Sequence, residues 1–402
     1  MKHQEHLVDR LGRFYREARL EVPASAPAWI LPQRRNRPSW QPVLASATLA
    51  AIVVALFFGV RIARDRAQVR VATSPTASPV ATPSATPSAT PSPSPAPSPD
   101  ASWVTSRFSV GSVSALLLDS SAVFSLGPSK LTRIDRSSGA ATTVADPTNA
   151  NTFAATSAGL WIAAGPDIAG ATPNSRSLTL LDPTTLAVKR QVSLPGQPGS
   201  DMNAGPQLAG GPGLLWFGYG NGLYRLNPDT GATLSSQQLA GTATSLSIDP
   251  SGQRLYVGVG PSQTQAATVI ELDASTGNRI ASAPTGGAGL GGPHVAAALD
   301  GVWVSYATGM KGQVEHRRTA DLSQTGHPIV TSNTIRAVVG TNALWLVDGM
   351  AQQLSCADPA TGAIRASVAE TQPAAFALDA SGAYLGDSQG IAVLQPPASC
   401  RG

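Results

Sequence analysis

The sequence is poor in the residues that most enzymes use for catalysis. Among 402 residues there are 5 histidines and 2 cysteines, and only 13% of the residues are Asp, Glu, Lys or Arg. It contains no GxSxG, HExxH or CxxC motif and no EF-hand loop, the patterns that position a nucleophile, a zinc ion, a redox pair or a calcium ion. The composition therefore predicts neither a cofactor nor a metal site, and it favours a binding protein over an enzyme.

One glycine-rich segment, GAGLGG at 287–292, matches the GxGxxG pattern of dinucleotide-binding loops. In those loops the glycines open a helix whose N-terminus holds the pyrophosphate. No helical pattern follows this segment, and the residues around it have the pattern of strands. We interpret it as a flexible loop.

The net charge of +4 is unevenly distributed along the chain. Residues 1–70 carry 12 basic and 5 acidic side chains (12 − 5 = +7), whereas residues 101–402 carry 16 basic and 18 acidic ones (16 − 18 = −2). The basic excess flanks an apolar segment, where arginines can contact anionic lipid head groups. It does not indicate a nucleic-acid partner.

That apolar segment, PVLASATLAAIVVALFFGV at 42–60, has no charged residue over 19 positions. As a helix it would extend for about 28 Å, enough to cross the hydrocarbon core of a bilayer. It is longer than a usual signal-peptide core, and no small-residue cleavage site follows it. The sequence therefore predicts an uncleaved, single-pass transmembrane helix.

The segments on either side of the span give the orientation. Close to it, three arginines precede and four follow, so the charge rule is nearly balanced. Residues 61–101 form a basic flank and then a run of Ala, Ser, Thr and Pro, which is typical of a disordered, extended stalk outside the membrane. We expect a cytoplasmic N-terminal segment, 1–41, and an external C-terminal domain.

Within the cytoplasmic segment, Leu7, Leu11, Phe14 and Ala18 recur at helical spacing. This pattern predicts an amphipathic helix over 3–21. Such a helix could bind a cytoplasmic partner or lie on the inner surface of the membrane.

Residues 102–402 contain seven copies of a short apolar motif. The copies are VFSL, LWI, LWF, LYV, VWV, LWL and AYL, beginning at Val123, Leu160, Leu215, Leu255, Val302, Leu344 and Ala383. Each copy follows a turn of small residues, and most precede a second turn such as NPDTG or DASTG. The mean spacing, 301/7 = 43 residues, suits four strands per unit. The pattern predicts an all-β, seven-bladed β-propeller.

Four tryptophans, Trp161, Trp216, Trp303 and Trp345, fall at the centre of the motif, where neighbouring blades should pack together. Within the third unit, Asn221 and Gly222 separate two apolar runs. Both residue types tolerate positive φ, so they predict a two-residue type I′ turn.

Four segments carry a resemblance to known propellers. RLYVGVG and TVIELDASTGNRIA resemble the repeat of the YVTN family, and GLWIAA and GLLWFGYG are similar to blades of virginiamycin B lyase-type propellers. The second resemblance implies a metal-dependent lyase that uses a histidine with acidic ligands beside the central channel. His294 is the histidine expected there, but Glu271 and Glu315 fall in other strands, so the activity does not follow.

The long connections predict where a ligand would bind. In a propeller blade the first strand runs from the top face to the bottom face, so interblade and second-to-third connections lie on the top. The connections 164–177, 194–207, 260–267, 283–294 and 307–312 all belong to these two classes. Variable loops on a rigid scaffold often form binding sites. The candidate ligand-binding residues are Asp167, Arg176, Asp201, Asn203, His294 and Arg336.

The two chain ends predict how the ring closes. The last unit ends in IAVLQPPASC, and Pro396 and Pro397 cannot extend a paired fourth strand. Residues 103–110 alternate in the manner of a strand, so we expect them to pair with the last blade. Cys356 and Cys400 lie in adjacent units, where they either form a disulfide or are two separate small residues.

These observations favour a membrane-anchored, extracytoplasmic propeller that binds a protein or a glycan as a sensor or scaffold. The alternative is a metal-dependent lyase or hydrolase with its site at the top of the channel.

Overall fold

The computed structural model describes most of the second of two compact units, Ser92–Gly402. The described residues are 103–146, 150–164, 177–193, 205–262, 265–286, 292–308, 311–331, 336–340, 342–370, 373–380 and 382–401. The amphipathic helix expected at 3–21, the span expected at 42–60 and the stalk expected at 61–101 lie outside them. Among the described residues no helix has the length and apolarity needed to cross a membrane.

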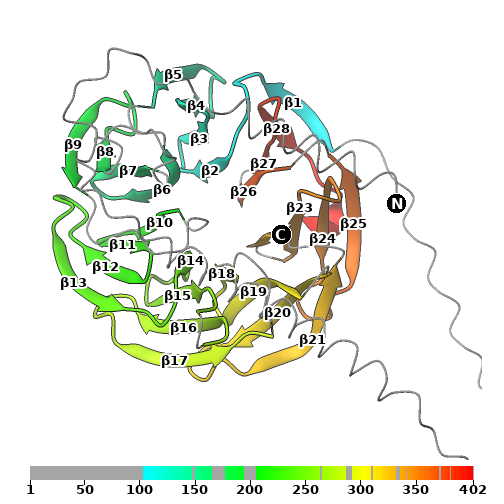
Figure 1. Cartoon of the computed structure of the whole chain (residues 1–402). Coiled ribbons are helices and arrows are strands. Elements are labelled where there is room, and N and C mark those ends of the chain that lie inside the picture. Colours follow the sequence, from blue (N-terminus) through cyan, green and yellow to red (C-terminus); the bar gives the residue numbers. More distant parts are fainter. Residues whose placement is uncertain are drawn as a thin grey trace, which may run out of the picture. The chain divides into compact units, whose positions relative to one another are not determined.

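Seven four-stranded antiparallel sheets are arranged around a central channel, which confirms the seven-bladed β-propeller (Figure 1). Blade 1 comprises β2 (Ala115–Leu118), β3 (Ala122–Gly127), β4 (Lys130–Asp135) and β5 (Ala141–Ala145). Blade 2 comprises β6 (Ala150–Thr156), β7 (Gly159–Ala164), β8 (Ser177–Leu181) and β9 (Val188–Ser193). Blade 3 comprises β10 (Gln207–Gly211), β11 (Leu214–Tyr219), β12 (Gly222–Leu226) and β13 (Thr233–Gln238).

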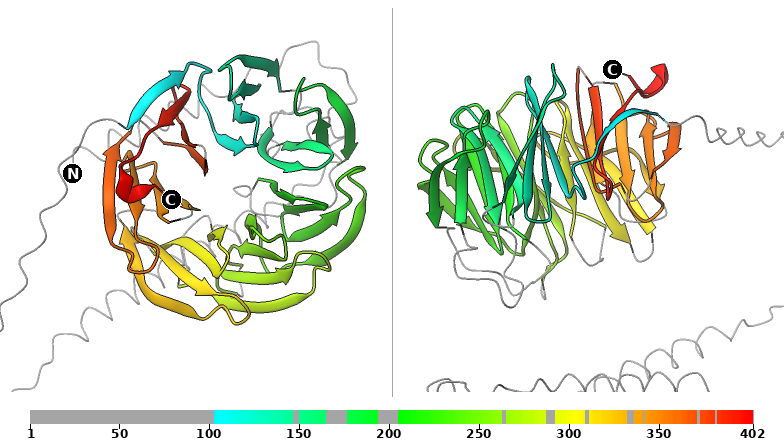
Figure 2. Two further views of the ribbon diagram at one scale, coloured as in Figure 1. Left: turned by 180° about the vertical axis from the view of Figure 1, so that it is seen from behind. Right: turned by 90° about the horizontal axis from the view of Figure 1, so that it is seen from above.

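The next three blades follow the same order from the channel outward (Figure 2). Blade 4 comprises β14 (Ala243–Ile248), β15 (Arg254–Val259), β16 (Thr268–Asp273) and β17 (Arg279–Pro284). Blade 5 comprises β18 (His294–Ala297), β19 (Gly301–Thr308), β20 (Lys311–Arg318) and β21 (Gln324–Thr331). Blade 6 comprises β22 (Arg336–Val339), β23 (Leu344–Asp348), β24 (Gln353–Ala357) and β25 (Ile364–Ala369).

Blade 7 is built from both ends of the domain, as the sequence predicts. It contains β26 (Ala375–Asp379), β27 (Gly382–Gly386), β28 (Ile391–Leu394) and, as its outer strand, β1 (Val104–Phe108). In this pairing Val104 lies opposite Leu394 and Phe108 lies opposite Ile391. The closure expected from 103–110 is therefore confirmed.

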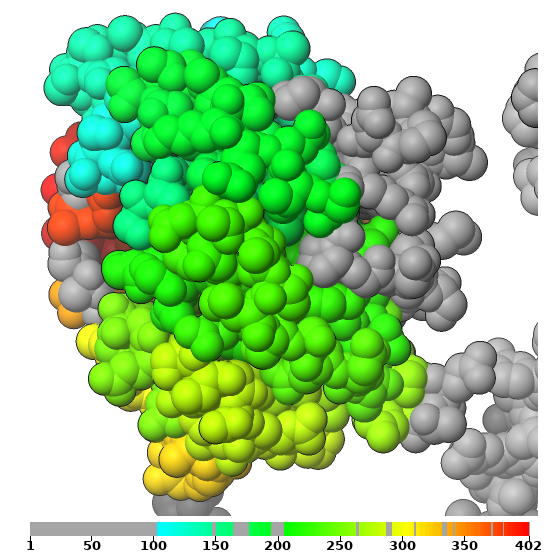
Figure 3. Space-filling model, turned by 90° about the vertical axis from the view of Figure 1, so that its left-hand side faces the viewer, coloured from blue at the N-terminus to red at the C-terminus, as the bar shows by residue number. Residues whose placement is uncertain are grey.

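All seven apolar motifs form the second strand of a blade, where their side chains are buried between sheets. Trp161, Trp216 and Trp345 are each no more than 1% exposed. Two of these rings also bond to the next blade: Nε1 of Trp161 donates to the Pro228 carbonyl at 2.8 Å, and Nε1 of Trp216 donates to the Ala274 carbonyl at 2.9 Å. The fourth strands of the blades form the outer surface of the ring. On it the first four blades appear as successive bands (Figure 3).

The turns between third and fourth strands share one construction in five blades. An Asp or Asn accepts backbone N–H bonds from the residues two and three positions later; these residues are Asp135, Asp182, Asn227, Asp273 and Asp358. The fifth residue has positive φ, and in four of the five turns it is glycine. Leu186 takes this position in blade 2 with φ 61°, and its side chain is buried.

The turn expected at Asn221 and Gly222 is displaced by one residue. Tyr219 lies opposite Gly222, so the two turn residues are Gly220 and Asn221. Of these only Gly220 has positive φ, at 54°. Positive φ at the first turn residue alone is the pattern of a type II′ turn, so the type I′ prediction is wrong.

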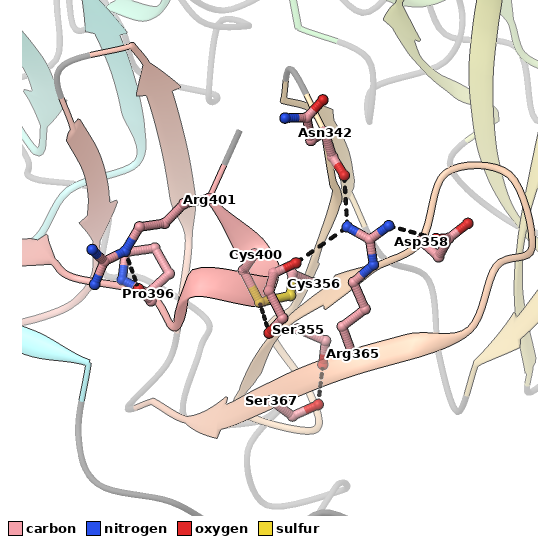
Figure 4. The surroundings of a disulfide bond; sticks show 10 residues. Asn342, Ser355, Cys356, Asp358, Arg365, Ser367, Pro396, Cys400 and Arg401 are labelled. Carbon is pink, nitrogen blue, oxygen red and sulfur yellow. Dashed lines mark hydrogen bonds and ion pairs between the residues drawn. A yellow bond between two sulfur atoms is a disulfide. The ribbon is translucent and has the colours of Figure 1, made fainter.

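The C-terminal tail is held against blade 6. It forms a short 3-10 helix, η3 (Ala398–Cys400), and Cys400 makes a disulfide with Cys356 of β24 (Figure 4). Arg365 supports the same contact, because its guanidinium donates to the Asn342 and Ser399 carbonyls. The tail thus joins the last two blades on the bottom face.

The packing of the tryptophans predicts different costs for two matched glycine substitutions. Gly139 and Gly231 occupy the same turn position with φ 71° and 72°. A Cβ at Gly139 would lie 3.6 Å from Phe108, an ordinary contact, whereas a Cβ at Gly231 would lie 2.8 Å from the Trp161 ring. Gly139→Ala should cost about 1–2 kcal/mol of backbone strain, and Gly231→Ala about 1–3 kcal/mol more, because the core is overpacked.

Chemical denaturation of both variants measures this difference. Equal losses of unfolding free energy in the two variants would contradict the proposed contact between Trp161 and the turn of blade 3.

Candidate functional site

The first strands of the blades begin around the top mouth of the channel. There a cavity of about 610 Å³ is lined by residues at the starts of six inner strands, β2, β6, β10, β14, β18 and β22. Its polar side chains include Asn151, Gln207, His294 and Arg336. The sequence predicted that His294 and Arg336 belong to one site, and the structure places both on the same cavity wall.

Arg336 is the first residue of β22, its side chain is exposed, and it lines the cavity at the mouth. Its Nη1 donates to the Ala374 carbonyl at 3.4 Å. The surrounding protein lowers the pKa of Arg336 through desolvation, although a guanidinium stays protonated at physiological pH. Among the described residues that line the mouth, it is the only charged side chain at neutral pH.

His294 is the first residue of the neighbouring inner strand, β18, and is half-buried. Burial lowers its pKa to about 4, and the positive charge of Arg336 contributes to the same shift. The imidazole is therefore neutral at pH 7, so that one ring nitrogen can donate and the other can accept a hydrogen bond.

The backbone next to His294 is fixed by blade 4. The Pro293 carbonyl accepts from Oγ1 of Thr244 at 2.6 Å and from Oγ of Ser245 at 3.0 Å. The Ser245 hydroxyl also accepts the N–H of Val295 at 3.0 Å. Bonds on both sides of His294 therefore hold it at the mouth.

The bottom half of the channel has a different character. A second cavity, of about 630 Å³, is lined by residues of β2, β6, β10 and β14, including Leu117, Leu118, Leu246 and Ile248. Along β2, β6, β10 and β14 the lining therefore changes from polar side chains at the mouth to mainly apolar ones lower in the channel.

The two glutamates expected in other strands lie between blades, away from the mouth. Glu271 of β16 accepts the N–H of Ala320 at 2.8 Å and lies 3.3 Å from Arg254, and burial raises its pKa. Glu315 of β20 is paired with Arg317 at 2.6 Å. Within the described part of the chain, no group of three or more His, Cys, Asp or Glu side chains could hold a metal ion.

The structure corrects one of the five long connections. The connection expected at 307–312 is short, because β19 and β20 extend until Thr308 lies opposite Lys311. The strand ends next to the other four connections agree with the expected positions. Asp167, Arg176, Asp201 and Asn203 lie outside the described residues.

Sequence reasoning missed Asn151 and Gln207 as lining residues. Both lie at the start of a first strand, at or next to the position that His294 and Arg336 occupy in theirs. Aligning the first strands of all units, in addition to their apolar second strands, would have identified them.

The comparisons with known proteins support the fold. No protein-family model matches the chain, and no curated protein does. Among solved structures, U3-55K is 10% identical, with a TM-score of 0.54 over 72% of this chain and 97% of that one. The WD40 repeats of RRP9 are 9% identical, with a TM-score of 0.53 over 72% and 95%. Hydrazine synthase of Kuenenia stuttgartiensis is 11% identical, with a TM-score of 0.50 over 73% and 97%.

At these identities the likeness shows the propeller fold alone. The resemblance to YVTN and virginiamycin B lyase-type propellers stays a prediction.

The proximity of Arg336 predicts the titration of His294. Replacing Arg336 by Gln removes a positive charge and so favours the protonated imidazole. The pKa of His294 should rise above about 4 but stay below the ordinary 6.5, because burial is the larger cause. Proton NMR titration of the imidazole measures the shift.

Arg190→Gln is the control, because Arg190 is exposed on the outer strand β9. An unchanged His294 pKa in Arg336→Gln would show that the two side chains do not interact at the mouth.

Proposed function

We propose that this chain is a single-pass membrane protein whose propeller lies outside the cytoplasm and binds a protein or glycan ligand with its top face. It acts as a sensor or scaffold. The N-terminal segment, 1–41, lies in the cytoplasm, where the helix expected at 3–21 contacts a partner or the membrane surface.

The observation that carries this proposal is the guanidinium at the mouth. Arg336 has no acidic partner among the described residues that line the cavity. An exposed guanidinium at the mouth of a cavity forms charge-assisted hydrogen bonds when an anion or a set of acceptors is present. A ligand with an acidic or oxygen-rich group would supply this.

The connections around the mouth support the same face. β7 ends at Ala164 and β8 begins at Ser177, and β9 ends at Ser193 and β10 begins at Gln207. By their place in the blade order, both connections belong to the face that carries the polar cavity. Long connections next to a preformed cavity are typical of binding surfaces.

The disulfide supports a location outside the cytoplasm. Cys356 and Cys400 are joined although 44 residues separate them in the sequence, and both are buried. Disulfides persist in oxidising compartments and are rare in the cytosol. This agrees with the orientation expected from the uncharged span at 42–60 and the stalk.

Retention of envelope material tests the binding surface. The full chain, purified in detergent and immobilised, is incubated with cell-envelope extract from its source. Arg336→Gln and His294→Ala should lose most of the retained material, because each removes a polar group at the mouth.

Two control variants should retain it. Asp229→Ala changes an exposed turn on the bottom face, and Arg190→Gln removes a positive charge from an outer strand. If all four variants retain the same material as the unmodified chain, binding does not use the top face.

A further inference from the structure

The side-chain charges at the mouth indicate which anionic group would bind there. Among the described residues that line the mouth, Arg336 provides the one positive charge, and His294 beside it is neutral at pH 7. A phosphate monoester carries about −1.5 to −2 at this pH, which a single guanidinium would not balance. A carboxylate carries a single negative charge, and its two oxygens match the planar fork of a guanidinium. The mouth therefore suits a carboxylate better than a phosphate.

The other polar groups at the mouth suit hydroxyls. Asn151 and Gln207 have side-chain amides, which can both donate and accept hydrogen bonds. The Gln207 amide nitrogen donates to the Gly205 carbonyl at 3.1 Å, so its oxygen is oriented by that bond. The neutral His294 ring adds one donor and one acceptor. Thr152 adds a hydroxyl to the lining of the same cavity.

The size and the remaining lining are compatible with a sugar ring. The cavity of about 610 Å³ lies within the usual range for small-ligand sites, about 300–1,000 Å³. Phe153 lines it between the polar top and the apolar lower half of the channel. A sugar ring presents hydroxyls at its edge and C–H groups on its face. The hydroxyls can bond to the polar side chains, and the C–H groups can pack against Phe153.

From this arrangement we propose that the mouth binds a uronic acid residue of an acidic glycan, with the carboxylate on Arg336 and the sugar hydroxyls on His294, Asn151 and Gln207. The inference rests on the proposed function for the location of the site. It deepens that function by choosing the glycan over the protein and by naming the chemical group.

Isothermal titration of the full chain in detergent with trigalacturonate tests this inference. Trigalacturonate should bind, and maltotriose, which is neutral, should not. Arg336→Gln should weaken binding by at least about ten-fold, because a charge-assisted hydrogen bond is lost. Arg336→Lys should bind with intermediate affinity, because it keeps the charge but not the bidentate geometry. Arg190→Gln should bind like the unmodified chain, and melting curves check that every variant is folded.

Other outcomes would overturn the inference. Failure of trigalacturonate to bind, or equal binding by folded Arg336→Gln, would exclude a uronate site at this mouth. Equal binding of the peptide acetyl-Ala-Glu-Ala-amide would show that the mouth recognises a carboxylate without recognising a sugar. The retention experiment separates this inference from the proposed function. If Arg336→Gln retains less envelope material than the unmodified chain, the top face still binds a ligand even though that ligand is not a uronate.

Discussion

The pairing of β1 with β28 is the constraint on which the ring depends. Blade 7 has only three strands from the C-terminal end of the chain, and β1 completes it from a position nearly 300 residues earlier. Arg107 of β1 forms an ion pair with the fully buried Asp387 of the same blade. Trp103 packs edge-on against Trp345 of blade 6, with ring centroids 6.0 Å apart. Strand, ion pair and ring contact therefore join the last blades to the start of the domain.

Closure also determines the site. Because the seven sheets pack face to face around the channel with their first strands innermost (Figure 1), these strands begin at one level. This places the first residues of β18 and β22, His294 and Arg336, side by side at the mouth. The same geometry places Leu118 and Ile248, the last residues of β2 and β14, toward the other end. The polar side chains at the mouth and the apolar ones lower in the channel thus follow from the residue types at the two ends of individual inner strands.

Much of the fold could be predicted from the sequence, because the second strands are buried on both faces and keep their large apolar residues. Local details depended on register, which the apolar pattern does not determine. Tyr219 pairs with Gly222, so the hairpin turn falls at Gly220 and Asn221. Thr308 pairs with Lys311, so an apparent loop is part of two strands.

The site was only partly predictable for a related reason. Charged or rare residues such as Arg336 and His294 are conspicuous in a sequence poor in both. Asn151 and Gln207 are common surface types, and only their position at the start of inner strands, next to the channel, gives them significance.

The central proposal is that the chain is anchored in the membrane with its propeller outside the cytoplasm. Protease protection tests this topology most directly. Proteinase K added to intact cells should cut within the segment 61–101 and release a folded fragment of about 30 kDa from the 41.0 kDa chain. Residues 1–41 should remain protected until the membrane is permeabilised. Release of the fragment without permeabilisation is the predicted result, and full protection of the propeller in intact cells would contradict the account.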